Sequence, residues 1–234
     1  MKVRVFESKT IDRMTKPVFH SAVFVICLLL TTSVMGAGQP CAPFEGGDVD
    51  PKILASMRAA AAQGRLYRVD PDVSAVGFCV RHFPLQEFRG EFTDLVGGLA
   101  FPQTRTQYGQ ALLLIFTPSL KSRNAVLEHM VKGPRFMDTA NHPEILYVGR
   151  RFEWVNQVHA HIYGELTVRG KMHPVMFDVD IDIPDDSKGK LPDRIRMRGR
   201  SQVSRFKYDM RSHRFFVSET IKLCLVVEVV RDGF

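Results

Sequence analysis

This chain has few cysteines and one tryptophan, and it lacks the local motifs that mark the common enzyme classes. Its 234 residues contain four cysteines, and no pair of them has the spacing of a metal site. No nucleophile elbow, phosphate-binding loop, dinucleotide fingerprint or Ser-His-Asp order occurs. We therefore expect a protein that is not an enzyme and that needs no cofactor of its own.

The first 36 residues differ in composition from the rest of the chain. Basic residues between Lys2 and Lys16 precede an apolar stretch from Val18 to Leu30, and small residues follow from Ser33 onward. This order predicts a secretory signal peptide over residues 1–36, cut after Gly36 or Gly38. The alternative, a membrane anchor, needs about 20 apolar residues, and the run is shorter than that.

Removal of this segment would take away five basic and two acidic residues and lower the formal net charge from +7 to +4. A charge of this size is a weak indicator of nucleic-acid binding, so we expect no nucleic-acid partner. Cys41, Cys79 and Cys224 would remain. Cys79 and Cys224 lie on the polar faces of the first long strand and the last strand, so a cross-strand disulfide and two free thiols both stay open.

The remaining chain divides into a short extension and one strand-rich domain. Residues 37–64 begin with proline and glycine, and Pro51 to Ala62 then predicts a short alanine-rich helix. We interpret residues 37–64 as an appended segment that is a poor candidate for the core. Residues 65–234 read almost entirely as strands and form one domain.

The clearest strand signal is an alternation of apolar and polar residues between Val158 and Ile183, interrupted by Arg169-Gly170-Lys171. A period of two on both sides of a short turn predicts an antiparallel hairpin with one dry face and one wet face. The apolar face of this hairpin carries Val158, Ala160, Ile162, Gly164, Leu166, Val168, Val175, Phe177, Val179, Ile181 and Ile183.

About eight strands of this kind predict a mainly β fold, an eight-stranded antiparallel barrel, because closure removes exposed edges; a sandwich is the alternative. One interruption is helical. Ser119 or Ser122 would cap a helix whose inner face carries Ala125, Val126, His129 and Met130, and Gly133-Pro134 would end it.

Four groups of residues between 66 and 231 together resemble the YceI family. The first runs from Tyr67 to Asp70 and on through Val76-Gly77-Phe78 and His82 to Phe88–Phe92; the others are His129 with Phe136, Asp138 and His142-Pro143; Gly164–Gly170 with Pro174-Val175; and Val217-Ser218-Glu219. The resemblance implies a periplasmic, lipocalin-like barrel that holds a long isoprenoid or a related amphiphile in its interior, without catalysis.

The chain departs from this family at two places. Val126 and Leu127 stand where an Arg-Asp pair is usual before the helical histidine. Arg205–Met210 stands where a sequence of the type Arg-Ser-Asp-Phe-Gly-Met is common, so an aspartate and a glycine are lost. These changes remove polar groups that could anchor a ligand head group. The resemblance therefore does not identify the exact ligand of this chain.

The ligand we expect is an isoprenoid-type lipid or a quinone-like amphiphile, held by an apolar wall with histidines at its mouth. The alternative is a filled barrel with a structural or stress-response role that acts through a protein partner. A transient membrane contact and a second copy of the chain are the further partners considered. The candidate ligand-binding residues are Phe78, Val80, His82, Phe92, Leu114, Phe116, His129, Phe136, Tyr147, Ile162, Leu166 and Phe177.

Two polar rows lie on the wet faces of the strands. His159 and His161 lie about 7 Å apart on one strand face, with Glu165 further along, which is a feasible metal-ligand spacing. Because that face is turned to solvent, where such pairs are usually incidental, we predict no metal site. The row of Arg194, Arg196, Arg198 and Arg200 opposite Asp178, Asp180 and Asp182 predicts a ladder of opposite charges.

Overall fold

The computed structural model describes residues 51–63, 65–83, 86–100, 109–182 and 192–231. The predicted signal peptide over residues 1–36 and Cys41 lie outside these ranges. Within them, no helix is long and apolar enough to cross a membrane. The described part contains the helices α1 (Pro51–Ala61) and α2 (Ala125–Lys132). Its strands are β1 (Leu66–Val69), β2 (Ala75–His82), β3 (Gln86–Phe92), β4 (Leu95–Ala100), β5 (Gln110–Phe116), β6 (Leu120–Ser122), β7 (Glu144–Trp154), β8 (His159–Val168), β9 (Lys171–Asp182), β10 (Arg194–Ser204) and β11 (Val217–Arg231).

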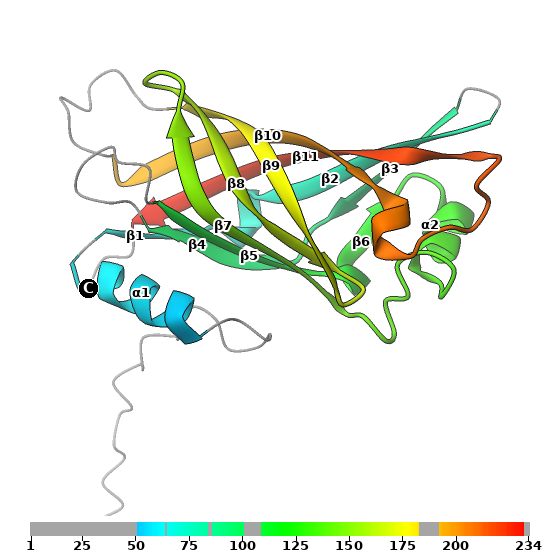
Figure 1. Ribbon diagram of the computed structural model, residues 1–234, viewed down its shortest axis with the longest axis horizontal. Helices are drawn as coiled ribbons and strands as arrows, with labels where there is room; N and C mark the ends of the chain where they lie inside the picture. Colours follow the sequence, from blue (N-terminus) through cyan, green and yellow to red (C-terminus); the bar gives the residue numbers. More distant parts are fainter. Residues whose placement is uncertain (1–50, 64, 84–85, 101–108, 183–191, 232–234) are drawn as a thin grey trace, which may run out of the picture. The chain divides into compact units, whose positions relative to one another are not determined.

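Eight of these strands close a ring (Figure 1). The order is β1, β4, β5, β7, β8, β9, β10 and β11, and β11 pairs with β1 to complete it. Every neighbouring pair in the ring is antiparallel. The predicted eight-stranded antiparallel barrel with a helical insertion is confirmed, and the sandwich alternative is wrong.

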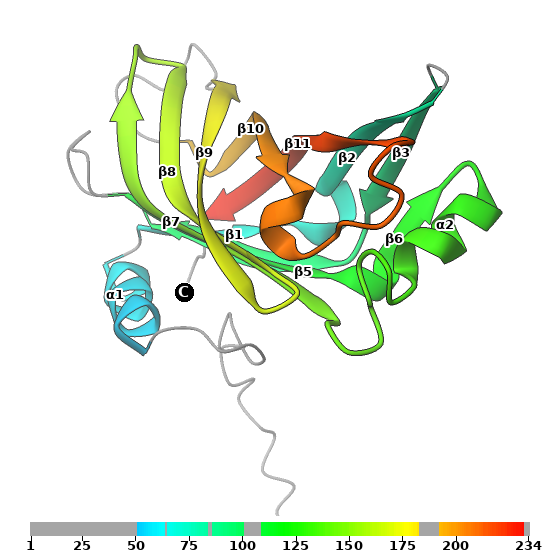
Figure 2. The same cartoon turned by 45° about the vertical axis from the view of Figure 1, so that its right-hand side comes forward.

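The other three strands extend one end of the barrel. β11 has 15 residues, and its segment Val217–Val226 pairs with β2, which in turn pairs with β3 and then β6. On the other side of this end, the pairing of β5 with β7 stops at Phe116 opposite Glu144. Helix α2 lies against β6 at the same end, as both ribbon views show (Figure 2).

The hairpin read from the sequence is β8 with β9. Ile162 lies opposite Phe177 and Ala160 opposite Val179, all four buried. Arg169 and Gly170 form the turn, with φ of 50° and 68°. Positive φ at both central residues is the requirement of a type I′ hairpin turn, which glycine meets without a steric penalty.

Strand β5 is apolar from Ala111 to Phe116, because both of its faces are covered. Leu113 and Ile115 face the barrel interior, whereas Leu112 packs under α1 against Ile53 and Met57. Residues 51–61 therefore cover part of the outer wall, so this described part of the predicted extension 37–64 does contribute buried residues. An amphipathic helix with only three buried positions gives a weak signal on its own.

The helical insertion is present, but its cap and its inner face differ from the sequence prediction. Asn124, and neither Ser119 nor Ser122, is the N-cap, because its side chain accepts a hydrogen bond from the Leu127 amide at 3.0 Å. Leu127 and Val131 face the barrel, whereas Val126 is 78% exposed. Two pairs of residues four apart in this helix are apolar, Val126 with Met130 and Leu127 with Val131. Periodicity alone therefore does not show which pair faces the barrel. Gly133 ends the helix as predicted.

The charge ladder between β9 and β10 is present with a diagonal offset. Arg198 pairs with Asp182 at 3.6 Å, and Arg200 pairs with Asp180 at 3.1 Å. Arg194 instead contacts Asp70 and Glu228. The ladder is exposed, so we expect it to contribute little to stability.

The two described cysteines are free thiols in neighbouring strands. Cys79 lies opposite Lys222, and Cys224 lies opposite Gly77, so the register does not set the two sulfur atoms directly across from each other. Burial raises the pKa of the Cys79 thiol, with a further contribution from nearby Glu87.

Helix α1 should contribute measurably to stability. Met57 is fully buried between α1 and the outer wall, so Met57→Ala should lower the free energy of unfolding by about 2 to 5 kcal/mol. Urea unfolding followed by circular dichroism measures this. Arg58→Ala, on the exposed side of the same helix, is the control and should change little; equal effects of the two variants would contradict the packing.

Candidate functional site

Three adjoining cavities follow the barrel interior. The mouth cavity, beside α2, encloses about 860 Å³ of space not filled by atoms, part of it open to solvent. The central and deep cavities enclose about 710 Å³ and 460 Å³ on the same measure. Phe78, Met137, Met210 and Ile221 line both the mouth and central cavities. Leu113, Tyr147, Phe177 and Leu225 line both the central and deep cavities, so the three cavities adjoin one another.

Most of the candidate residues line this space. They enter from several strands of the sheet, because alternate residues of each strand point inward. Phe136 comes instead from the loop after α2. The predicted residues that line a cavity are Phe78, Val80, His82, Phe92, Phe136, Tyr147, Ile162, Leu166 and Phe177.

Three candidate residues lie elsewhere, which corrects their predicted placement. Leu114 is buried on the outer side of β5, and Phe116, at the end of that strand, lines none of the three cavities. An entirely apolar strand has no alternation from which to read its inner face. His129 is exposed on α2, because the inner face of that helix is set by Leu127 and Val131.

Other lining residues were missed by the sequence reading. Ile221, Leu223 and Leu225 alternate along β11, and that period of two could have identified them. They pack against the core yet remain only partly buried, because they face open space. Met137 and Met210 come from loops, and Tyr208 ends a short 3-10 helix, Arg205–Tyr208, so no periodicity points to the interior.

Arg205 is buried beside the mouth cavity and organises its wall. Its guanidinium donates hydrogen bonds to the carbonyl oxygens of Ser218 at 2.9 Å, Ser212 at 2.9 Å and Val217 at 3.0 Å, and also to that of Met210. Burial lowers its pKa. Because its donors are taken up by the backbone of residues 210–218, the structural role of Arg205 is to hold this loop in place.

Two aromatic rings from different loops meet at the mouth. Phe136 and His213 stack with ring centroids 5.9 Å apart and an interplanar angle of 6°. His82, at the end of β2, lines the same cavity, with its Nδ1 atom 3.2 Å from the carbonyl oxygen of Phe83. The exposed side chains of Met130 and Phe216 also line the mouth cavity, so this cavity reaches the surface.

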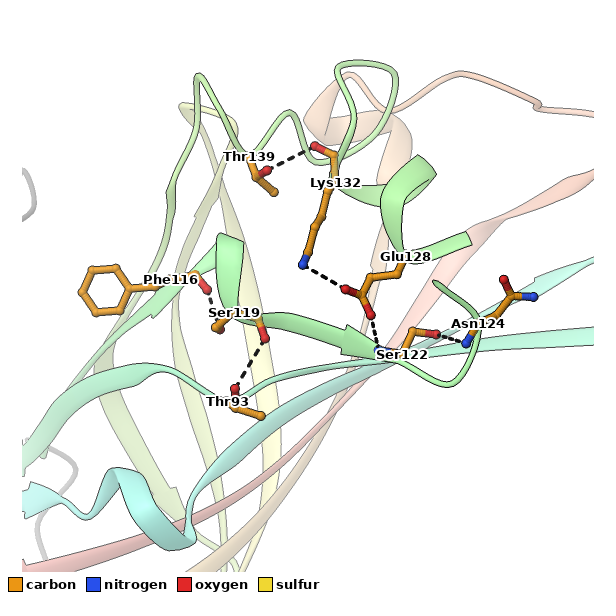
Figure 3. Close-up of polar contacts among 8 residues, drawn as sticks. All are labelled: Thr93, Phe116, Ser119, Ser122, Asn124, Glu128, Lys132 and Thr139. Carbon is orange, nitrogen blue, oxygen red and sulfur yellow. Dashed lines mark hydrogen bonds and ion pairs between the residues drawn. The ribbon is translucent and has the colours of Figure 1, made fainter. Parts of the chain in front are cut away.

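Helix α2 is tied to β6 by a small polar network (Figure 3). Glu128 accepts hydrogen bonds from the Ser122 amide at 2.8 Å and from Lys132 Nζ at 3.0 Å, which lower its pKa. The backbone amide of Asn124 donates a hydrogen bond to Ser122 Oγ at 3.3 Å. The hydroxyl of Thr139 donates one to the Lys132 carbonyl oxygen at 3.3 Å. In the same view, the Thr93 hydroxyl donates a hydrogen bond at 3.4 Å to the carbonyl oxygen of Ser119, the residue just before β6. These contacts fix one wall of the mouth.

The two tyrosines of the central cavity differ in their hydrogen bonding. Tyr147 donates its hydroxyl to the Ile162 carbonyl oxygen at 2.9 Å. The Tyr208 hydroxyl is buried and has no hydrogen-bond partner among the described residues. Burial raises the pKa of Tyr208 to about 12 and that of Tyr147 above its usual range. The Tyr208 hydroxyl is therefore a buried polar group without a partner among the described residues, and it does not reach the surface of the central cavity.

A closed eight-stranded antiparallel barrel with apolar cavities inside it is a lipocalin-like fold. The family model of the YceI-like domain matches residues 67–229. The chain belongs to this family. The predicted family membership is confirmed, and the match covers the whole ring of strands except the first residue of β1 and the last two of β11.

Curated relatives are distant. A UPF0312 protein of Pseudomonas putida (strain GB-1) is 24% identical over 127 residues, which cover 53% of this chain and 65% of the relative. A UPF0312 protein of Pseudomonas syringae pv. tomato is 23% identical over 124 residues, 52% of this chain and 65% of the relative. The chain thus spans less than two thirds of the length of these relatives.

Solved structures share the fold at low sequence identity. BcnA of Burkholderia cenocepacia has a TM-score of 0.60 and 16% identity, with 68% of this chain and 98% of that one covered. A polyisoprenoid-binding domain from Saccharophagus degradans, implicated in plant cell wall breakdown, has a TM-score of 0.53 and 15% identity, with 71% and 98% covered. At this level of identity the likeness shows the fold alone.

The two tyrosines provide a matched pair of substitutions. In lipid-free protein, Tyr147→Phe should lower the free energy of unfolding by about 1 kcal/mol, because a buried carbonyl oxygen loses its donor. Tyr208→Phe should leave stability unchanged or raise it, because it removes a hydroxyl that has no partner. Urea unfolding measures both, and a larger loss for Tyr208→Phe than for Tyr147→Phe would show that Tyr208 is hydrogen-bonded in solution.

Proposed function

We propose that this protein is a periplasmic carrier that holds an isoprenoid-type lipid or a quinone-like amphiphile in its barrel and performs no catalysis. The observation that carries the proposal is the series of three adjoining, mainly apolar cavities, at the mouth, in the centre and deep in the barrel. The Saccharophagus domain of the same fold is described as polyisoprenoid-binding, which supports this class of ligand. The basic, apolar and small segments of residues 1–36 support export.

The energetics favour a long apolar ligand. Each methylene-sized group moved from water into such a space contributes about 0.8 kcal/mol, so a polyprenyl chain binds without any charged contact. A filled barrel would bury its inward-facing side chains completely. Val203, Ile221 and Leu223 are instead only partly buried, which favours the carrier over the filled structural barrel.

The central cavity offers a ligand apolar contacts alone, because no polar atom of the described residues lies on its surface. Tyr208 lines this cavity, but its hydroxyl is buried away from the open space. A polar head group would instead meet His82 or His213, which line the mouth cavity.

Extraction of the purified protein with organic solvent tests the carrier proposal. Mass spectrometry should detect a lipid in a fixed ratio to the protein. Leu223→Trp places a larger side chain in the central cavity and should lower that ratio several-fold. Met176→Trp, on the exposed outer face of β9, is the control and should retain the lipid. Absence of a stoichiometric lipid in the wild-type protein, produced with its export segment, would contradict the proposal.

The mouth end also has the composition of a lipid-facing surface. Its aromatic rim consists of Phe83, Phe215 and Phe216, exposed to 71%, 79% and 61%. The Phe83 amide donates a hydrogen bond to the Phe216 carbonyl oxygen at 2.8 Å, which holds the backbone segments around Phe83 and Phe216 together. Exposed aromatic side chains beside a ligand entrance favour contact with the membrane interface.

Basic side chains occur in the segments that form this end of the barrel. Arg135, Arg211 and Arg214 are exposed, and within the described residues none of them has an ion-pair partner. The guanidinium of Arg214 lies 4.7 Å from the ring centroid of Phe215. We infer a transient contact of this end with an anionic bilayer, through which the ligand enters and leaves.

Vesicle sedimentation tests the membrane contact. The protein should bind phosphatidylglycerol vesicles more strongly than phosphatidylcholine vesicles, and added salt should weaken the binding. Phe215→Ser with Phe216→Ser should reduce binding to the anionic vesicles several-fold. Val155→Ser with Val158→Ser, at the exposed β7–β8 turn, is the matched control. Equal binding of the two double variants would show that the aromatic rim is not the contact.

A further inference from the structure

The outer wall of the barrel carries a cluster of metal-ligating side chains that the carrier function does not use. His159 and His161 lie on β8, opposite Asp180 and Asp178 of β9 respectively. These four residues alternate with Ala160, Ile162, Phe177 and Val179, which face the interior. The cluster is therefore separated from the ligand cavities by the thickness of the sheet.

The geometry of this cluster brings three ligand atoms together. His159 Nε2 lies 2.9 Å from Asp178 Oδ1. One ligand atom from each of His159, His161 and Asp178 lies within 4.8 Å of the other two. In a tetrahedral site with bonds of about 2.0 to 2.2 Å, neighbouring ligand atoms are about 3.3 Å apart. Side-chain rotations that move the ligand atoms by about 1.5 Å would bring all three within bonding distance of one ion.

A fourth residue orients the central histidine. Asp180 Oδ1 lies 3.0 Å from His159 Nδ1, and Asp180 Oδ2 accepts a hydrogen bond from Arg200 at 3.1 Å. Asp180 is thus held between a histidine and an arginine. A carboxylate bonded to one nitrogen of a metal-ligating histidine fixes the ring and leaves its other nitrogen for the ion. Here that other nitrogen, Nε2, is the one that faces Asp178.

We propose that His159, His161 and Asp178 bind a divalent transition-metal ion of the zinc type on the outer wall, with Asp180 as the positioning residue. Two imidazole nitrogens and one carboxylate oxygen suit Zn²⁺, Ni²⁺ or Cu²⁺ and do not suit the all-oxygen preference of Mg²⁺ or Ca²⁺. Three protein ligands leave a coordination position for water or for a group from another molecule. The exposure of the face, which argued against a site in the sequence, gives the ion direct access.

Calorimetric titration of the purified protein with Zn²⁺ tests this site. The protein should bind one ion at the cluster, and His161→Ala should abolish that binding. Asp180→Asn should weaken it about 10- to 100-fold while retaining the stoichiometry, as expected for a residue that acts through His159. His129→Ala, which removes an exposed histidine of α2, is the control and should leave binding unchanged.

Two further measurements keep the outcome unambiguous. Cys41→Ser, Cys79→Ser and Cys224→Ser together serve as the background for every variant, so that no cysteine outside residues 1–36 can bind the ion. Circular dichroism confirms that each variant is folded. Zinc binding that persists in both His159→Ala and His161→Ala, or no binding by the background protein, would overturn the proposal. The lipid content of these variants should equal that of the background protein, so this test is independent of the carrier function.

Discussion

The pairing of β11 with β1 is the interaction on which the rest of the barrel depends. It brings the last described strand onto the first, with Tyr67 opposite Arg231 and Val69 opposite Val229. Without it, the sheet would have two free edges, and its apolar face would remain open to water. Ser74 reinforces the seam just beyond β1, since its hydroxyl accepts a hydrogen bond from the Glu228 amide at 3.0 Å. The interior becomes an enclosed space only because these two ends meet.

The length of β11 then decides where that space opens. Its last residues close the ring with β1, and the rest of the strand pairs with β2, which leads away through β3 to β6. At this end the wall is completed by α2 and the loops around Arg205, which lack the continuous hydrogen bonding of a sheet. The ring of paired strands is therefore complete where β11 meets β1, whereas the other end is built from parts that can supply an entrance. The aromatic rim and its arginines belong to this second end.

The two faces of the hairpin β8–β9 separate two kinds of chemistry. The inner face supplies Ile162 and Phe177 to the apolar cavities, and the outer face gathers histidine and aspartate side chains. Because successive residues of a strand point in opposite directions, each face can change without disturbing the other. A ligand carrier with an ion site on its outer wall is consistent with this division.

The sequence by itself determined the class of fold and much of the inner wall. The alternation along β8, β9 and β2 identified Ile162, Phe177 and Phe78, because a period of two assigns each residue to a face. Only the tertiary structure decided which face of β5 and which face of α2 turn inward. The apolar run of β5 has no alternation, and the short helix α2 has apolar residues on two of its faces, so neither sequence shows its inner face. The tertiary structure also decided that loop residues such as Met210 line the central cavity, because that depends on the path of the loop. It decided likewise that His159 contacts Asp178, because that depends on strand register. Local periodicity shows on which face of a sheet a side chain lies. The distance between side chains of different strands depends on how those strands pair.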